Sequence, residues 1–239
     1  MSSDRRAHTP DFARRFWDTA YAQGEDLAHW HREPPDEALG RVLAEGHPGP
    51  GARCVLDVGC GTGAEASWLA ARGTRAWGAE ALEPEVLEPA VLGLAARRLV
   101  VVGVDLSVTA LARAAAAREP APGGRWHRVA GSSFELPLAD GTVDLVLDAG
   151  CLHTIGRRSR ALYARELVRV SAPGARVLVR GARRDREEEG LFGVGPGACR
   201  RWLGPAFSVE WSMPLVLPAS SGALDGVAVL LRRAGRGGT

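Results

Sequence analysis

The sequence predicts an α/β fold built on an open, nucleotide-binding sheet. The first observation is an apolar, largely β-branched run, Cys54 to Val58, which ends in a glycine-rich turn, Gly59 to Gly63. The second is a helix-like segment that follows the turn directly, from Ala64 to Arg72. A strand, a tight turn and a helix start, in this order, form the opening unit of such a sheet.

Length and charge restrict the possible classes of protein. The chain has 239 residues and a formal net charge of +2, which suits one α/β domain and gives no general attraction to polyanions or membranes. The sequence has no basic stripe with interleaved aromatic residues, so it does not indicate a nucleic-acid partner. The four cysteines form no C-x-x-C pair and no metal spacing, as expected for free thiols in a reducing compartment.

The chain shows no targeting or membrane-spanning segment. Met1 to Pro10 is polar and lacks the apolar core of a secretory signal. The most apolar window, Val86 to Val104, is interrupted by charged residues and a proline. We therefore expect a cytoplasmic protein. Nothing in the sequence indicates its oligomeric state.

The glycine turn has features that separate two classes of nucleotide site. Glycine at positions 59, 61 and 63 permits a positive φ and lets a ligand approach the backbone closely. The free N–H groups at the start of the next helix favour polar or anionic ligand groups. The spacing is G-x-G-x-G, and the acidic Asp57 precedes it, whereas a dinucleotide site has G-x-G-x-x-G. These features argue against a nicotinamide oxidoreductase.

The string Leu56-Asp57-Val58-Gly59-Cys60-Gly61-Thr62-Gly63 resembles motif I of class I S-adenosylmethionine (SAM) dependent methyltransferases. The resemblance implies a Rossmann-like, doubly wound, mostly parallel sheet of about seven strands with an antiparallel hairpin at its edge. It also implies SAM as the cofactor. Its methionine end would be held by Asp57 and by the backbone of Gly59, Cys60, Gly61 and Gly63.

The N-terminal segment is unusually aromatic, and its pattern is helical from Asp11 to Gln23. Phe16-Trp17-Asp18-Thr19-Ala20-Tyr21, followed by Gly24, His29-Trp30 and Pro34-Pro35, is similar to the arm of the thiopurine, thiol and halide methyltransferases. In that family the arm closes over the cofactor, which would bring Trp30 to it. The alternative is that these aromatic side chains only pack the arm against the core. We expect residues 1–52 to form an N-terminal helical arm and residues 53–239 to form the methyltransferase domain.

Two acidic residues are candidates for binding the cofactor ribose. Such an acid usually ends the second strand, ~20 residues beyond the glycine turn, and its two oxygens can accept from both hydroxyls. Glu80 lies 17 residues after Gly63, whereas Asp105 lies 42 residues after it. However, Asp105 ends the better strand, and Val-Val-Gly-Val-Asp-Leu-Ser is the common methyltransferase form. We favour Asp105, with Leu106 beside it, and expect an insertion over about residues 77–100.

The segment Gly131 to Leu138 resembles the methyltransferase G-D-x-x-x-L-P segment that reads the adenine. The resemblance implies that Ser132, Ser133 and Phe134 frame the adenine ring. Ser132 stands where the family has Asp, so its hydroxyl can bond the adenine amino group only without charge assistance.

The segment Asp148 to Ile155 resembles D-R-G-C-F-H-H-L, a motif shared by thiopurine-like and tellurite-resistance-like methyltransferases. A loop that leaves a central strand at its carboxyl end borders the ligand crevice of an open sheet. Asp148 and Gly150 are therefore predicted to contact the cofactor. Gly150, Cys151 and His153 are predicted to border the methyl group. The family's Arg and second His are replaced by Ala149 and Thr154, so the roles of those two side chains do not carry over.

His153 is the best candidate for a general base, because an imidazole titrates near neutral pH. The alternative is a histidine that lines the pocket wall or serves a structural hydrogen bond. Cys151 is expected to be a small buried residue rather than a nucleophile.

The remaining elements are expected in chain order. Helices are predicted over Asp36 to Glu45, Val108 to Arg118, Arg157 to Val170 and Ala198 to Leu203, and strands over Trp126 to Ala130, Val143 to Asp148, Arg176 to Arg180, Phe207 to Trp211 and Val227 to Leu231.

The sequence therefore predicts an enzyme that transfers a methyl group from SAM to a small-molecule acceptor without a metal. A thiol or another soft nucleophile is the preferred acceptor. The alternatives are an O- or N-methyltransferase of a natural-product-like molecule and a catalytically retired SAM-binding protein.

Overall fold

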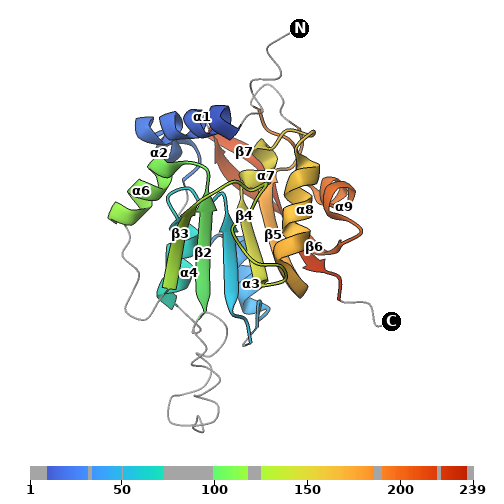
Figure 1. Ribbon diagram of the computed structural model, residues 1–239. Coiled ribbons are helices and arrows are strands. Elements are labelled where there is room, and N and C mark those ends of the chain that lie inside the picture. Colours follow the sequence, from blue (N-terminus) through green and yellow to red (C-terminus); the bar gives the residue numbers. More distant parts are fainter. Residues whose placement is uncertain are drawn as a thin grey trace.

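The computed structural model describes residues 10–31, 34–49, 51–72, 99–117, 125–185, 190–219 and 222–235. These residues form a sheet of seven strands in the order β3-β2-β1-β4-β5-β7-β6, with helices on both faces (Figure 1). The fold class predicted from the sequence is confirmed. In the part of the chain that is described, no helix is both long and apolar enough to cross a membrane.

The strands are β1 (Cys54–Val58), β2 (Val100–Asp105), β3 (Arg125–Ala130), β4 (Val143–Ala149), β5 (Ser171–Ala182), β6 (Phe207–Ala219) and β7 (Gly222–Arg233). Strand β1 pairs in parallel with β2 on one side and with β4 on the other. Strand β7 is antiparallel to both of its neighbours, β5 and β6. The strand order reverses between β1 and β4, and in such sheets ligands bind outside the carboxyl ends of the strands at this reversal.

The helices are α1 (Pro10–Gln23), α2 (Glu25–His29), α3 (Glu37–Ala44), α4 (Ala64–Arg72), α6 (Val108–Ala117), α7 (Cys151–Thr154), α8 (Arg160–Val170) and α9 (Pro196–Leu203). Helices α1, α2 and α7 lie at the end of the sheet to which β1, β2 and β4 point (Figure 1). The N-terminal arm therefore covers the carboxyl ends of the central strands.

The apolar core has two layers, one on each face of the sheet. Side chains of α3 and α4 pack on one face, and those of α8 and α9 pack on the other. Along β1, Val55 belongs to the first layer, whereas Leu56 and Val58 belong to the second. Successive side chains of a strand point to opposite faces, so Asp57 lies on the same face as α3 and α4.

The second-strand prediction for residues 99–107 is confirmed, because β2 pairs with β1 from Cys54 to Val58 and ends at Asp105. Glu80 and most of the expected insertion lie outside the described residues.

The edge hairpin is longer than predicted. Strand β6 has 13 residues and β7 has 12, whereas the expected strands covered only Phe207 to Trp211 and Val227 to Leu231. Pro214 and Pro218 lie within β6 and argue against a strand in the sequence. Proline is tolerated here because β6 is the edge strand and pairs only with β7. Helices α2 and α7 were also not predicted, because they are too short to show a helical period.

A buried ion-pair cluster joins three elements on the α3–α4 face. Arg180 of β5 is 1% exposed. Its guanidinium pairs with Glu65 in the first turn of α4 and, at 3.0 Å, with Asp36, whose side chain also caps α3. A single side chain of the sheet therefore holds the starts of both helices.

We expect the Arg180→Ala variant to lose about 3–5 kcal/mol of unfolding free energy, because it leaves two partly buried carboxylates without their cation. Urea unfolding followed by circular dichroism measures this loss. The matched control is Arg183→Ala, which breaks a pair with Asp225 whose side chains are 37% and 67% exposed and should cost less than about 1 kcal/mol. Equal losses in the two variants would contradict the role of Arg180.

Candidate functional site

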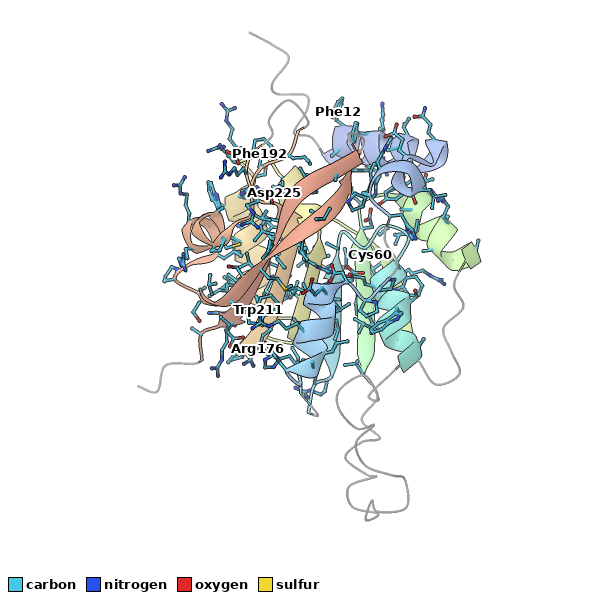
Figure 2. The ribbon with its side chains drawn as sticks, turned by 180° about the vertical axis from the view of Figure 1, so that it is seen from behind. Phe12, Cys60, Arg176, Phe192, Trp211 and Asp225 are labelled. Atoms are coloured by element: carbon cyan, nitrogen blue, oxygen red, sulfur yellow. The ribbon has the colours of Figure 1, made fainter. Side chains whose placement is uncertain are left out.

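The glycine turn leaves β1 at the point where the strand order reverses. The N–H groups of Gly59 and Cys60 both donate to the Val104 carbonyl of β2, at 2.8 and 3.1 Å. Glycines 59, 61 and 63 have φ values of 69°, 54° and 69°, which confirms the predicted need for glycine. Figure 2 shows Cys60 above α4, at the end of the sheet that the arm covers.

Protein side chains press against all three glycines. A Cβ atom on Gly59 would lie 2.8 Å from the Cys151 Cβ, one on Gly61 would overlap the Tyr21 hydroxyl, and one on Gly63 would overlap the Trp126 ring. The glycines were predicted to make room for a ligand. In the structure they also make room for the arm, the loop after β4 and strand β3.

Asp105 joins the end of β2 to the glycine turn. Its Oδ2 accepts the Gly61 N–H at 2.7 Å, and its Oδ1 accepts the Ser107 N–H at 2.7 Å. The side chain is 8% exposed, and burial raises the pKa of Asp105 although these hydrogen bonds oppose the rise. Each carboxylate oxygen has a second lone pair, so Asp105 can still accept from a ligand.

Asp57 is buried without a hydrogen-bond partner among the described residues. It is 3% exposed, and among the described residues no hydrogen bond reaches its carboxyl group. Burial, with a further contribution from Glu65, raises the pKa of Asp57 well above its usual value, and the Arg180 cation offsets only part of this rise. A positively charged ligand group at this carboxyl would supply the missing partner.

Asp148, predicted to contact the cofactor, makes several hydrogen bonds within the protein. Its carboxylate accepts the N–H groups of Gly150, Cys151 and Leu152 at 3.1, 2.8 and 3.0 Å and the hydroxyl hydrogen of Tyr163. The side chain is completely buried, and this burial raises the pKa of Asp148 to about 6. Asp148 therefore caps α7 and holds the loop after β4.

The His153 ring does not present a free base. Its Nδ1 accepts the Ala182 N–H at 3.1 Å, so the proton of the neutral ring lies on Nε2. Burial lowers the pKa of His153 to about 4, which keeps the ring neutral at physiological pH. This arrangement favours the alternative of a hydrogen-bonded structural histidine over the general-base prediction.

The two cysteines of the site are unreactive in this environment. Burial raises the pKa of Cys60 and of Cys151 well above the usual thiol range, so both remain protonated and neither is a nucleophile. The Ser133 side chain hydrogen-bonds Cys151 and brings the predicted adenine segment against the loop after β4.

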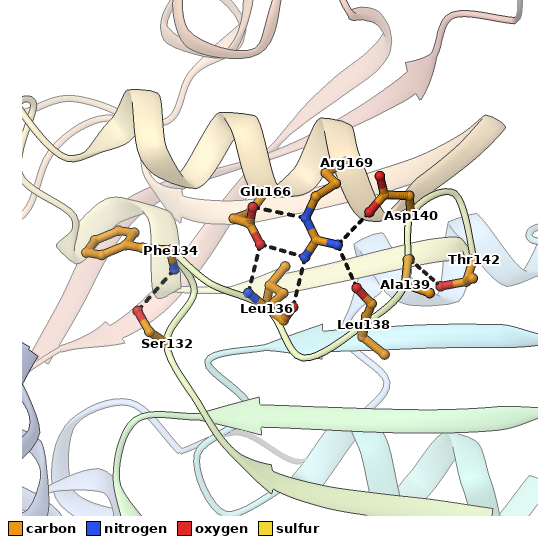
Figure 3. A network of polar contacts seen from close by, with 9 residues as sticks. All are labelled: Ser132, Phe134, Leu136, Leu138, Ala139, Asp140, Thr142, Glu166 and Arg169. Atoms are coloured by element: carbon orange, nitrogen blue, oxygen red, sulfur yellow. Dashed lines mark hydrogen bonds and ion pairs between the residues drawn. The ribbon is translucent and has the colours of Figure 1, made fainter.

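The predicted adenine segment is held rigidly from α8 (Figure 3). The Leu136 N–H donates to Glu166 at 2.8 Å, and Arg169 donates to the carbonyl oxygens of Leu136 and Leu138 at 2.8 and 2.6 Å. Ser132 Oγ accepts the Phe134 N–H at 3.1 Å. Backbone contacts therefore already engage the hydroxyl that replaces the family's Asp.

Trp30 packs against other aromatic side chains of the arm. It is 37% exposed and makes edge contacts with Trp17 and Tyr21, each at 6.0 Å between ring centroids. Tyr21, rather than Trp30, covers Gly61. The sequence analysis missed Tyr21 as a site residue, although it is the last residue of the arm's W-D-x-x-Y pattern.

A family model described as a methyltransferase domain matches residues 87–179. Over these residues the chain is similar to methyltransferase domains. Among curated proteins, none matches the sequence.

Solved structures with the same fold cover nearly the whole chain. One has a TM-score of 0.66 at 22% identity, and the match covers 94% of this chain and 93% of that protein. It comes from work on the conversion of a disulfide bond into a thioacetal group during echinomycin biosynthesis. Another is 1,6-didemethyltoxoflavin-N1-methyltransferase from Burkholderia thailandensis with bound S-adenosylhomocysteine. Its TM-score is 0.59 at 19% identity, and the match covers 93% of this chain and 87% of that protein. A third, the [4+2]-cyclase SpnF, has a TM-score of 0.63, 16% identity and coverage of 95% and 97%. At these identities the likeness shows the fold alone.

The methyltransferase family whose model matches residues 87–179 implies SAM as the cofactor, and the residues at the carboxyl edge fit that molecule. SAM is positively charged at its ammonium and sulfonium groups, and the buried Asp57 carboxyl accepts no hydrogen bond from a described residue. SAM also carries two ribose hydroxyls, and both oxygens of Asp105 can still accept. In the described part of the chain, no group of His, Cys, Asp or Glu side chains is arranged to hold a metal ion.

Proposed function

We propose that the protein binds SAM at the carboxyl edge of β1, β2 and β4 and transfers its methyl group to a small-molecule acceptor. The observation that carries this proposal is the buried carboxyl of Asp57 beside the glycine turn, which accepts no hydrogen bond from a described residue. A neutral ligand would leave that carboxyl unpaired, whereas the cationic methionine end of SAM would pair with it.

The contribution of the chain to transfer is mainly positioning. SAM supplies an activated methyl group on a sulfonium. In-line alignment of the reactants alone contributes several kcal/mol, up to ~7–11 in favourable systems. The three side chains packed on the turn glycines, Cys151, Tyr21 and Trp126, limit the space beside the turn and favour one cofactor pose. Trp30 and Trp17 support Tyr21 from outside.

We propose a thiol or another soft nucleophile as the acceptor. A free thiol has a pKa near ~8.5 and is already a few per cent thiolate at neutral pH, so it needs little help from a base. The neutral His153, with its Nδ1 in use, agrees with such an acceptor. The resemblance of the Asp148–Ile155 loop to thiopurine-like enzymes also supports it, as does the sulfur chemistry named for one fold relative.

An amine or hydroxyl of a natural-product-like molecule is the second candidate. Its support is the fold relative from Burkholderia thailandensis, which is named as an N1-methyltransferase. These acceptors hold their proton more tightly than a thiol does, so they depend more on a base.

SAM binding should depend on Asp105 and not on Glu80. Removal of one charge-assisted contact to the ribose is expected to cost about 1.5–3 kcal/mol, or roughly ten- to a hundredfold in affinity. Isothermal calorimetry with SAM measures this in Asp105→Ala, with Glu80→Ala as the matched acidic control.

Two results would contradict this proposal. A loss of affinity in Glu80→Ala with none in Asp105→Ala would refute the ribose assignment. No heat from SAM with the wild-type protein, together with binding of a nicotinamide dinucleotide, would refute the proposed function itself.

Thiols should be methylated faster than matched phenols and amines in a SAM-consumption screen. Because His153 offers no free lone pair in this structure, His153→Ala should slow transfer to thiols by less than the ~10²–10⁴ typical of losing a general base. Faster transfer to phenols, abolished by His153→Ala, would contradict a thiol acceptor.

A further inference from the structure

Asp18 of the arm contacts a segment that lies far away in the sequence. Its Oδ1 accepts the Ser107 hydroxyl at 2.7 Å and the Thr109 N–H at 3.0 Å. Burial raises the pKa of Asp18, but the hydrogen bonds from Thr109 and Ser107 outweigh it, so the pKa lies below the usual value. Asp18 is therefore a charged acceptor at the start of α6.

Ser107 links this contact to the cofactor site. It is completely buried, and its N–H donates to Asp105 Oδ1 at 2.7 Å. Its Oγ accepts the Ala110 N–H at 3.1 Å, so Ser107 also caps α6. A continuous path of hydrogen bonds thus runs from Asp18 through Ser107 and Asp105 to the Gly61 N–H.

The arm has a second attachment to α6 that does not touch this path. Arg113 pairs with Asp26 at 2.6 and 3.1 Å and donates to the Tyr21 carbonyl at 2.8 Å. The ion pair between Asp26 and Arg113 already attaches the arm to α6, so attachment alone does not require Asp18. The Asp18 contact differs because it ends on the residue that orients Asp105.

We propose that Asp18 is a positioning residue that orients the Asp105 carboxylate for the cofactor ribose. Without Asp18, the Ser107 hydroxyl loses its charged acceptor and the first turn of α6 loses one cap. The Ser107 N–H then no longer fixes Asp105 Oδ1 in one orientation. This inference rests on the proposed function, in which Asp105 contacts the ribose of SAM.

A double-mutant cycle on SAM affinity tests the proposal. Asp18→Ala should weaken SAM binding about tenfold in the wild-type background and less than about twofold in the Asp105→Ala background, because the two residues act through one contact. Asp18→Asn retains the Oδ1 acceptor without the charge, so it should recover most of the affinity. This variant also keeps the test valid if Asp18→Ala does not fold.

Asp26→Ala is the matched control, because it breaks the ion pair between the arm and Arg113 without touching Ser107. Its effect on SAM affinity should be additive with Asp105→Ala, as for independent sites. If Asp18→Ala is additive with Asp105→Ala, or leaves SAM affinity unchanged, Asp18 only docks the arm and the proposal is wrong. If wild-type protein does not bind SAM, the proposed function fails first, and calorimetry on that protein alone reveals it.

Discussion

A buried carboxyl group is costly unless it has a partner, and the carboxyl edge of this sheet buries three of them. Asp148 is satisfied by three backbone N–H groups and Tyr163. Asp105 is satisfied in part, by the N–H groups of Gly61 and Ser107. Asp57 accepts no such hydrogen bond among the described residues, and the charge of Arg180 offsets only part of the effect of its burial.

The surrounding structure maintains this imbalance. Arg180 lies on the same face as Asp57, but its guanidinium is taken up by Glu65 and Asp36. The glycine turn allows Tyr21 and Cys151 to close around the carboxyl edge without a Cβ in the way. The charge of Arg180 offsets only part of the rise in the pKa of Asp57, so a cationic ligand group paired with this carboxyl would add to the free energy of ligand binding.

Local patterns in the sequence predicted the parts of the site that are local. The strand, turn and helix around Gly59 to Gly63 follow from composition and spacing, and the strong strand character of β2 correctly favoured Asp105 as its last residue despite the unusual spacing. The capping contacts of Asp148 could not be predicted because they depend on α7, which is only four residues long. The tautomer of His153 depends on the Ala182 N–H, which lies 29 residues away.

Contacts between distant segments could not be predicted. Asp18 meets Ser107 across 89 residues, and Arg180 meets Glu65 across 115. No pattern within one helix or strand signals such pairs, because they arise only when the sheet brings its elements together. The arm's aromatic spacing suggested an arm that closes over the cofactor. It did not indicate that Tyr21 is the side chain that reaches the turn.

Calorimetry of SAM binding in two buffers of different ionisation enthalpy tests the central role of Asp57 most directly. Burial raises the pKa of Asp57 in the free protein and pairing with a cation would lower it again, so between these two pKa values binding releases a proton. Affinity should therefore increase as pH rises, and the two buffers should report net proton release, which Asp57→Asn abolishes together with much of the affinity. Equal heats in both buffers for the wild-type protein, or unchanged affinity in Asp57→Asn, would contradict the account.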